Sequence, residues 1–103
     1  MVKDENDSFA TATEILSKKW SLVIVYALLD GEKRFSELER SIKDISPKVL
    51  ALTLNTLQRY GIIERRVEDT SPVRVKYRLT EKGRDLGEIV REIKKWSERW
   101  DNF

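Results

Sequence analysis

The residues best suited to chemistry lie between positions 46 and 60. Lys48, Leu52, Asn55 and Arg59 follow one another at steps of four, three and four residues, so on a helix they share one side. Long cationic side chains can reach guanine edges or phosphates, and an asparagine amide suits adenine. No acidic residue occurs from 46 to 60, so nothing there repels a phosphate backbone. The pattern is typical of a helix that contacts nucleic acid.

The charge of the chain is concentrated around this segment. The 103 residues carry 20 basic and 18 acidic side chains, for a net charge of only +2. Residues 46–80 hold seven basic and three acidic side chains, a net +4, which leaves −2 for the other 68 residues. Within 73–79, Arg74, Lys76 and Arg78 alternate with apolar residues, so one face of a strand is basic. Such a face can contact sugar-phosphate beside a minor groove, although it also protects an exposed strand edge from aggregation.

Helices are predicted ahead of this charged region. Apolar spacing predicts a first helix over residues 9–16. Residues 22–29 predict a second, because Asp30-Gly31 behind them resembles a helix C-cap. Their β-branched centre is also compatible with a buried strand.

Start and stop signals frame two further helices. A third, short helix is predicted from a capping box formed by Ser36 and Glu39, and its apolar face continues to Ile45. Ser46 is an N-cap candidate for the fourth helix, and Pro47 fits its first helical position, where the missing N–H costs nothing. This helix is predicted to end at residue 60, before a glycine.

After residue 61 the apolar period changes from 3.6 to 2. Residues 63–67 and 73–79 predict two strands, and the polar cluster 68–72 predicts the turn of a hairpin. The last helix is predicted over 80–103 with apolar residues at steps of three and four. As a helix this segment is about 36 Å long, against a radius of gyration near 13 Å for a 100-residue domain. We therefore expect its aromatic end to pack against a second copy rather than its own core.

The predicted order is that of a winged helix-turn-helix, mainly α with a small β-hairpin wing. We expect a flexible acidic N-terminus over 1–7 and one domain over 8–103. Cysteine and histidine are absent, and no spaced carboxylate pair or phosphate loop occurs, so no enzyme, metal site or cofactor is predicted. The longest apolar run has eight residues and no secretory signal follows Met1, which predicts a cytoplasmic protein without membrane contact.

The sequence resembles the HxlR-type winged helix-turn-helix transcriptional regulators, a branch related to the MarR-like proteins. The matching residues are Lys19-Trp20, 34–38 (RFSEL), Ile45-Ser46 with Lys48 and Leu50, Leu54 with Leu57, 61–65 (GIIER) and 75–83 (VKYRLTEKG). The resemblance implies a homodimeric repressor or activator of transcription. It implies that the first and last helices form the dimer interface, the fourth helix occupies a major groove and the wing touches flanking backbone.

Two departures from the family pattern affect these implications. Many members carry a cysteine before the first helix, near Asp7 or Ser8 here, and some use it to sense oxidants; this chain cannot do so. Where members often have polar residues on the recognition helix, this chain has Ala51 and Leu52. These residues favour apolar contact with thymine methyl groups, or a modest specificity.

Two sets of binding residues follow. For double-stranded DNA we predict Arg34, Ser36, Ser46, Pro47, Lys48, Leu52, Asn55, Arg59, Arg74 and Lys76. For the homodimer we predict Phe9, Ile15, Leu16, Ile89, Ile93, Trp96, Trp100 and Phe103. Arg59 can alternatively pair with Glu64, and a small-molecule effector is left open. The alternative function is a winged-helix module that binds another protein through its aromatic helix and binds no DNA.

Overall fold

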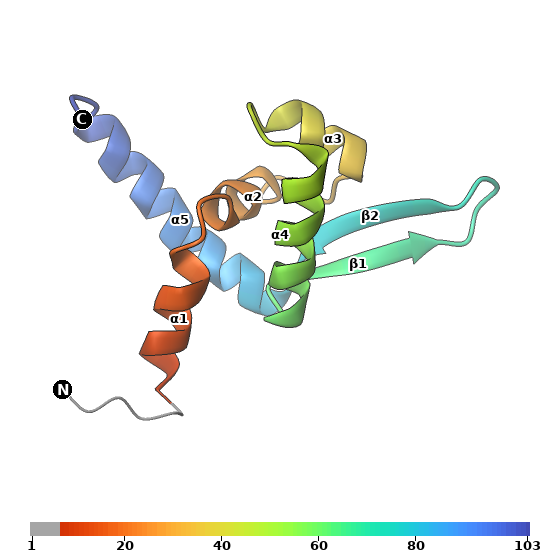
Figure 1. Cartoon of the computed structure of the whole chain (residues 1–103), viewed down its shortest axis with the longest axis horizontal. Coiled ribbons are helices and arrows are strands. Elements are labelled where there is room, and N and C mark those ends of the chain that lie inside the picture. The colour runs from red at the N-terminus through yellow and green to blue at the C-terminus, as the bar shows by residue number, and fades with distance from the viewer. Residues whose placement is uncertain (1–6) are drawn as a thin grey trace.

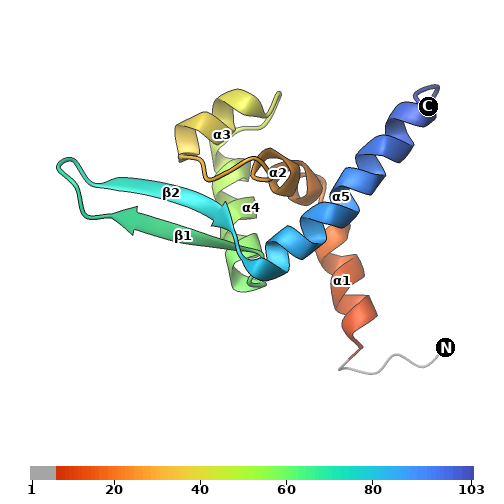
Figure 2. The same ribbon diagram turned by 180° about the vertical axis from the view of Figure 1, so that it is seen from behind.

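The computed structural model describes residues 7–103 and has the predicted winged-helix architecture (Figure 1). Its elements are α1 (Ser8–Leu16), α2 (Ser21–Ala27), α3 (Phe35–Ser41), α4 (Pro47–Arg59), β1 (Ile63–Glu68), β2 (Arg74–Leu79) and α5 (Glu81–Arg99). The hairpin projects from one side of the helical body, and α1 and the end of α5 diverge on the other (Figures 1 and 2). Within the described residues, no helix is long and apolar enough to cross a membrane.

The predicted flexible N-terminus falls outside the described residues except at its last position. Asp7 is not loose, because its carboxylate caps α1 by accepting hydrogen bonds from the backbone N–H groups of Phe9 (3.0 Å) and Ala10 (3.3 Å). The first helix therefore begins at Ser8, one residue before the predicted start.

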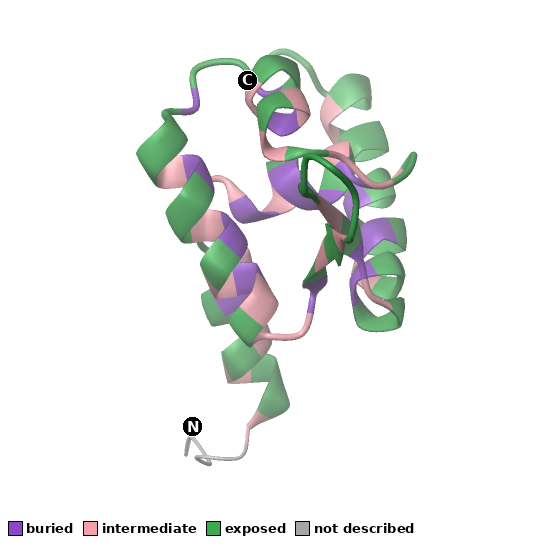
Figure 3. Cartoon of the chain, turned by 90° about the vertical axis from the view of Figure 1, so that its right-hand side faces the viewer, coloured by how far each residue is buried: buried purple, intermediate pink, exposed green. Residues whose placement is uncertain are grey.

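One apolar core lies where the helices meet the base of the hairpin, as the burial colouring shows (Figure 3). Its members are Ile15, Ile24, Val25, Leu28, Leu38, Ile42, Ile45, Leu50, Leu54, Leu57, Ile62, Ile63, Leu79 and Val90. Residues 22–27 are helical rather than a strand, and both Ile24 and Val25 are fully buried. This helix ends at Ala27, so Asp30-Gly31 is not its cap but belongs to the turn that follows.

The third helix begins earlier than its predicted capping box. Arg34 is the N-cap residue, and its backbone N–H donates to the Glu37 carboxylate at 2.8 Å. Ser36 therefore lies inside the first turn, and the predicted Ser36–Glu39 box is wrong, because Glu37 caps the helix at Arg34, two residues earlier. The helix ends at Ser41, yet Ile42 and Ile45 remain buried beyond it.

Both ends of α4 match their predicted signals. The Ser46 hydroxyl accepts a hydrogen bond from the Val49 N–H at 3.1 Å, and a proline occupies the first turn. At the other end, the Ile62 N–H donates to the Leu57 carbonyl at 2.9 Å, and Gly61 adopts a φ of 73°. This is a Schellman ending, which the missing side chain of glycine permits.

The hairpin is antiparallel, with Ile63 opposite Leu79 and Glu68 opposite Arg74. An isolated antiparallel bridge pairs Lys33 with Tyr77 of β2. The last helix, capped by the Thr80 hydroxyl, ends at Arg99 rather than running to residue 103.

The end of the last helix corrects the prediction that its apolar spacing of three and four residues continues to Phe103. Trp100 is the C-cap residue, and Phe103 lies beyond the helix. The Phe103 ring nonetheless packs on the Trp96 ring, with 5.4 Å between their centroids. Helical spacing therefore does not apply after Trp100, although the aromatic residues still gather at one place.

Candidate nucleic-acid interface

The outer face of α4 carries four side chains that are predicted to contact DNA. Lys48, Leu52, Asn55 and Arg59 are all exposed, and no acidic side chain lies on this helix. Its opposite face is formed by Leu50, Leu54 and Leu57, which are buried in the core. The burial of these three leucines fixes the rotation of α4, so the four candidate side chains must face solvent.

Other polar side chains of α4 bond to their own helix. The hydroxyls of Thr53 and Thr56 donate to the carbonyls of Val49 and Leu52, at 2.8 and 3.1 Å. The Gln58 amide donates to the Leu54 carbonyl at 3.4 Å. The hydrogen-bonding capacity that α4 offers to a ligand therefore comes mainly from the predicted lysine, asparagine and arginine.

Arg59 does not pair with Glu64. Its nearest hydrogen-bond partner is the Thr56 hydroxyl at 3.5 Å, whereas Glu64 forms an ion pair with Arg78 across the hairpin. Arg78 is thus neutralised by its cross-strand neighbour, and Arg59 remains available to an anion.

The charged face of the wing, residues 63–79, is an ion-pair network rather than a row of free cations. Arg66 and Lys76 lie directly opposite each other, an unfavourable like-charge pair. Glu32, in the turn between α2 and α3, lies 2.8 Å from Arg66 and 3.6 Å from Lys76. Glu68 lies 3.1 Å from Lys76. The two carboxylates offset the repulsion, so Lys76 is less available to phosphate than the sequence interpretation assumed.

The ion-pair network shifts the pKa values of two of its members, Glu32 and Arg66. The pKa of Glu32 lies below its ordinary value of 4.5, chiefly because of its hydrogen bond with Arg66. The pKa of Arg66 is raised by the same contact. The alternation of acidic and basic residues in the two strands signals these pairings, but the contribution of Glu32 has no local signal in the sequence.

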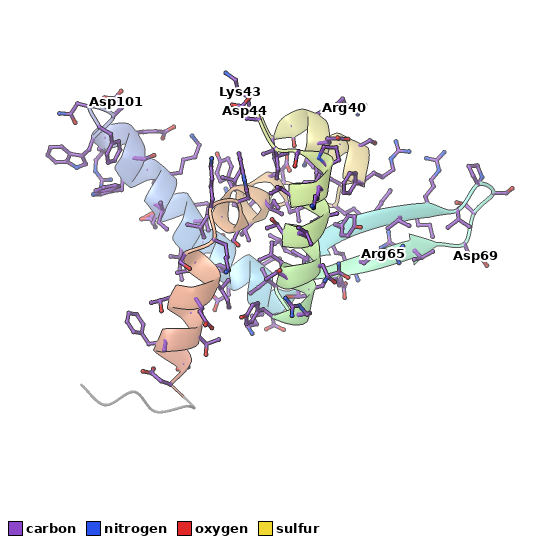
Figure 4. The ribbon with its side chains drawn as sticks, viewed as in Figure 1. Arg40, Lys43, Asp44, Arg65, Asp69 and Asp101 are labelled. Carbon is purple, nitrogen blue, oxygen red and sulfur yellow. The ribbon has the colours of Figure 1, made fainter. Side chains whose placement is uncertain are left out.

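Cations without an ion pair among residues 7–103 remain on the wing and beside α4. On the wing they are Arg74, which was predicted, and Arg65, which was missed; both are exposed. Arg40 and Lys43 are exposed near the start of α4, where the chain turns out of α3 (Figure 4). Helical spacing gave no signal for them, because Glu37 and Asp44 stand three and four residues from Arg40, and Glu39 stands four residues before Lys43.

The N-terminus of α3 contributes less than predicted. Arg34 and Ser36 are exposed, but Arg34 lies 3.6 Å from the Glu37 carboxylate. The same carboxylate also caps the helix, and its pKa is lowered chiefly by the backbone N–H of Arg34. This acid partly neutralises the end of α3.

Six of the eight predicted dimer residues are exposed apolar side chains of α1, α5 and the residues just after it. Phe9, Ile89, Ile93, Trp96, Trp100 and Phe103 are all exposed, from 41% for Ile93 to 85% for Phe103. Leu16 is half-buried beside a hollow of about 340 Å³ between α1 and α5. Ile15 is only 7% exposed because it packs into the core, so it offers little surface to a partner.

Within the described part of the chain, no three metal-ligating side chains gather at one place.

The helical core, the hairpin wing and the acid-free outer face of α4 define a winged helix-turn-helix DNA-binding protein. The chain belongs to the HxlR-like helix-turn-helix family, whose model matches residues 15–103. It is 44% identical over 92 residues to the uncharacterized HTH-type transcriptional regulator YvaP of Bacillus subtilis, covering 89% of this chain and 85% of that protein. It is 40% identical over 90 residues to YodB, an HTH-type transcriptional regulator of the same organism, covering 87% and 80%.

Solved structures agree with this assignment. The reduced form of YodB from B. subtilis superposes with a TM-score of 0.81 at 37% identity, covering 96% of this chain and 94% of that one. A MarR-family regulator from Porphyromonas gingivalis superposes with a TM-score of 0.84 at 32% identity, covering 95% and 96%. The protein is a DNA-binding transcriptional regulator of this family and not an enzyme.

Proposed function

We propose that the protein binds duplex DNA as a homodimer, with α4 in the major groove and the wing on flanking backbone. The observation that carries this proposal is the exposed, acid-free face of α4, where two cations and one amide project from a helix fixed by three buried leucines. An α-helix fits the major groove, and its cations and amides match the acceptors and donors found there.

The exposed apolar surface supports the homodimer. Ile93, Trp96, Trp100 and Phe103 are large, exposed and close to the end of α5, and Phe9 lies on the diverging α1. A second copy related by a two-fold axis would cover such a patch, because the same surface of each subunit then forms the interface. Two recognition helices would then lie about 34 Å apart and face a palindromic operator.

On the wing, the ion-pair network favours Arg74 over Lys76 as the phosphate contact. Arg74 is exposed and has no ion pair within the described residues, whereas Lys76 lies between two carboxylates. Contacts of this kind hold the protein in register on the duplex without specifying sequence.

DNA binding through α4 is tested by Lys48→Ala. Duplexes enriched from genome fragments by the purified protein serve as probes, and affinity is measured by fluorescence anisotropy at two salt concentrations. We expect Lys48→Ala to weaken binding and reduce its salt dependence, because one cation per protomer is lost. The control is Lys95→Ala, which removes an exposed lysine far along α5 that pairs with Glu92 at 3.1 Å. Equal affinity and equal salt dependence in both variants would refute the placement of α4.

The homodimer is tested separately by sedimentation of a Trp96→Ala, Trp100→Ala double variant. Both side chains are about half exposed in the single chain, so their removal should leave the fold intact and shift the protein toward monomer. A double variant that remains as dimeric as the parent would refute the proposed interface.

A further inference from the structure

One apolar side chain stands at the centre of the proposed recognition surface. Leu52 is 57% exposed, whereas Leu50, Leu54 and Leu57 on the same helix are at most 1% exposed. Ala51 beside it is also exposed. A lone exposed leucine needs no explanation on most surfaces, but this one is flanked by the cations Lys48 and Arg59.

The threonines beside Leu52 have already used their hydroxyl protons within the helix. The hydroxyls of Thr53 and Thr56 donate to carbonyls of their own helix, and the Thr56 bond ends on the Leu52 carbonyl itself. Hydrogen-bonding side chains free to meet a ligand lie toward the two ends of the face and at Asn55. The exposed centre of α4 therefore combines one large apolar group, Leu52, with the Asn55 amide.

The apolar group that the major groove presents at a base edge is the C5-methyl of thymine. We propose, resting on the proposed function, that Leu52 is a specificity-determining residue that packs against a thymine C5-methyl group in each half-site. Lys48 and Arg59, on either side of this contact, can bind phosphates of the DNA backbone. The helix carries no acidic side chain that would repel them.

The position of this thymine relative to the amide contact follows from helix geometry. Leu52 and Asn55 are three residues apart, or about 4.5 Å along the helix axis. The rise of a duplex is about 3.4 Å per base pair. The thymine should therefore lie one or two base pairs from the adenine that Asn55 is suited to bind.

Deoxyuridine tests the contact because it lacks only the methyl group. Duplexes are first enriched from a random-sequence pool by the full chain, and the best is remade with deoxyuridine in place of one thymidine at a time. We expect one position per half-site to lose about fourfold in affinity, the value for burying one CH₂-sized group. Substitution in both half-sites should then cost about sixteenfold.

Leu52→Ala supplies the matching protein change. Alanine is the best helix former, so α4 should be retained. The variant should bind the thymine duplex more weakly and no longer distinguish it from the deoxyuridine duplex. Val23→Ala, which trims a half-exposed apolar residue on α2, is the control and should keep the full discrimination.

The outcomes separate this inference from the proposed function. If a duplex is enriched and Lys48→Ala weakens its binding, yet every deoxyuridine substitution is neutral, the methyl contact is refuted and the proposed function stands. Discrimination that persists in Leu52→Ala also refutes it. If no duplex is enriched from the pool, both the proposed function and the inference fail.

Discussion

Arg74 and Lys76 provide a direct test of how the wing meets DNA. They are cations on the same face of β2, two residues apart, and differ mainly in their neighbours. Lys76 lies 3.1 Å from Glu68 and 3.6 Å from Glu32, while Arg74 is exposed and has no ion pair among residues 7–103. We therefore expect Arg74→Ala to weaken DNA binding, and Lys76→Ala to weaken it much less.

The size of the effect follows from counterion release. Each phosphate contact contributes about −0.9 to the slope of log affinity against log salt, so loss of Arg74 from both protomers should reduce the slope by about 1.8. Between about 50 and 200 mM salt, the affinity ratio of parent to variant should then change about twelvefold. Lys76 is already compensated by two carboxylates, so its removal should change the slope by clearly less.

The assay is fluorescence anisotropy of an enriched duplex, titrated with each variant at four or more salt concentrations and constant pH. Circular dichroism of each variant checks that the fold is retained. Equal slope changes for Arg74→Ala and Lys76→Ala would show that the ion-pair network does not govern phosphate contact. An unchanged slope in Arg74→Ala would remove the wing from the interface.

Three further predictions concern stability. Gly83→Ala should lower the free energy of unfolding in urea by about 3 kcal/mol, the upper end for overpacking, because the new Cβ would lie 2.0 Å from the backbone carbonyl oxygen of Ile62. Gly87→Ala should cost less, about 1 kcal/mol, because its Cβ meets the Leu29 side chain, which can rotate; equal losses would contradict this reasoning. Glu32 has a pKa below 4.5 in the folded chain, so its stabilisation is complete above pH 4.5 and is lost as the pH falls through its folded pKa. Unfolding of Glu32→Gln should therefore depend less on pH in this range, and an unchanged pH dependence would count against the network.

Elements with local signals were predictable from the sequence. The fourth helix has its N-cap serine, its proline and its terminal glycine within 16 residues, and its apolar period selects the buried face. Its candidate residues were therefore oriented correctly in advance. The third helix shows the limit of such signals, because Arg34 and Glu37 form the cap that the sequence placed at Ser36. Two overlapping segments satisfied the same spacing.

The wing and the dimer surface depended on contacts that spacing does not describe. Alternation correctly predicted a hairpin with a basic face, but Glu32 comes from 34 residues before Arg66 and pairs with Arg66 and Lys76 on that face. Ile15 shares the helical stripe of its neighbours, yet the core rather than a partner covers it. In both cases the deciding partner lies far away in the chain.

By itself the sequence determined the helices, the hairpin and the acid-free face of α4, because caps, turns and apolar periods act over a few residues. Only the tertiary structure decided which cations are free. The charge of a lysine or arginine is a property of its side chain, but its availability to phosphate depends on the nearest carboxylate. For Arg66 and Lys76 that carboxylate belongs to a turn brought close only when the wing packs beside α3.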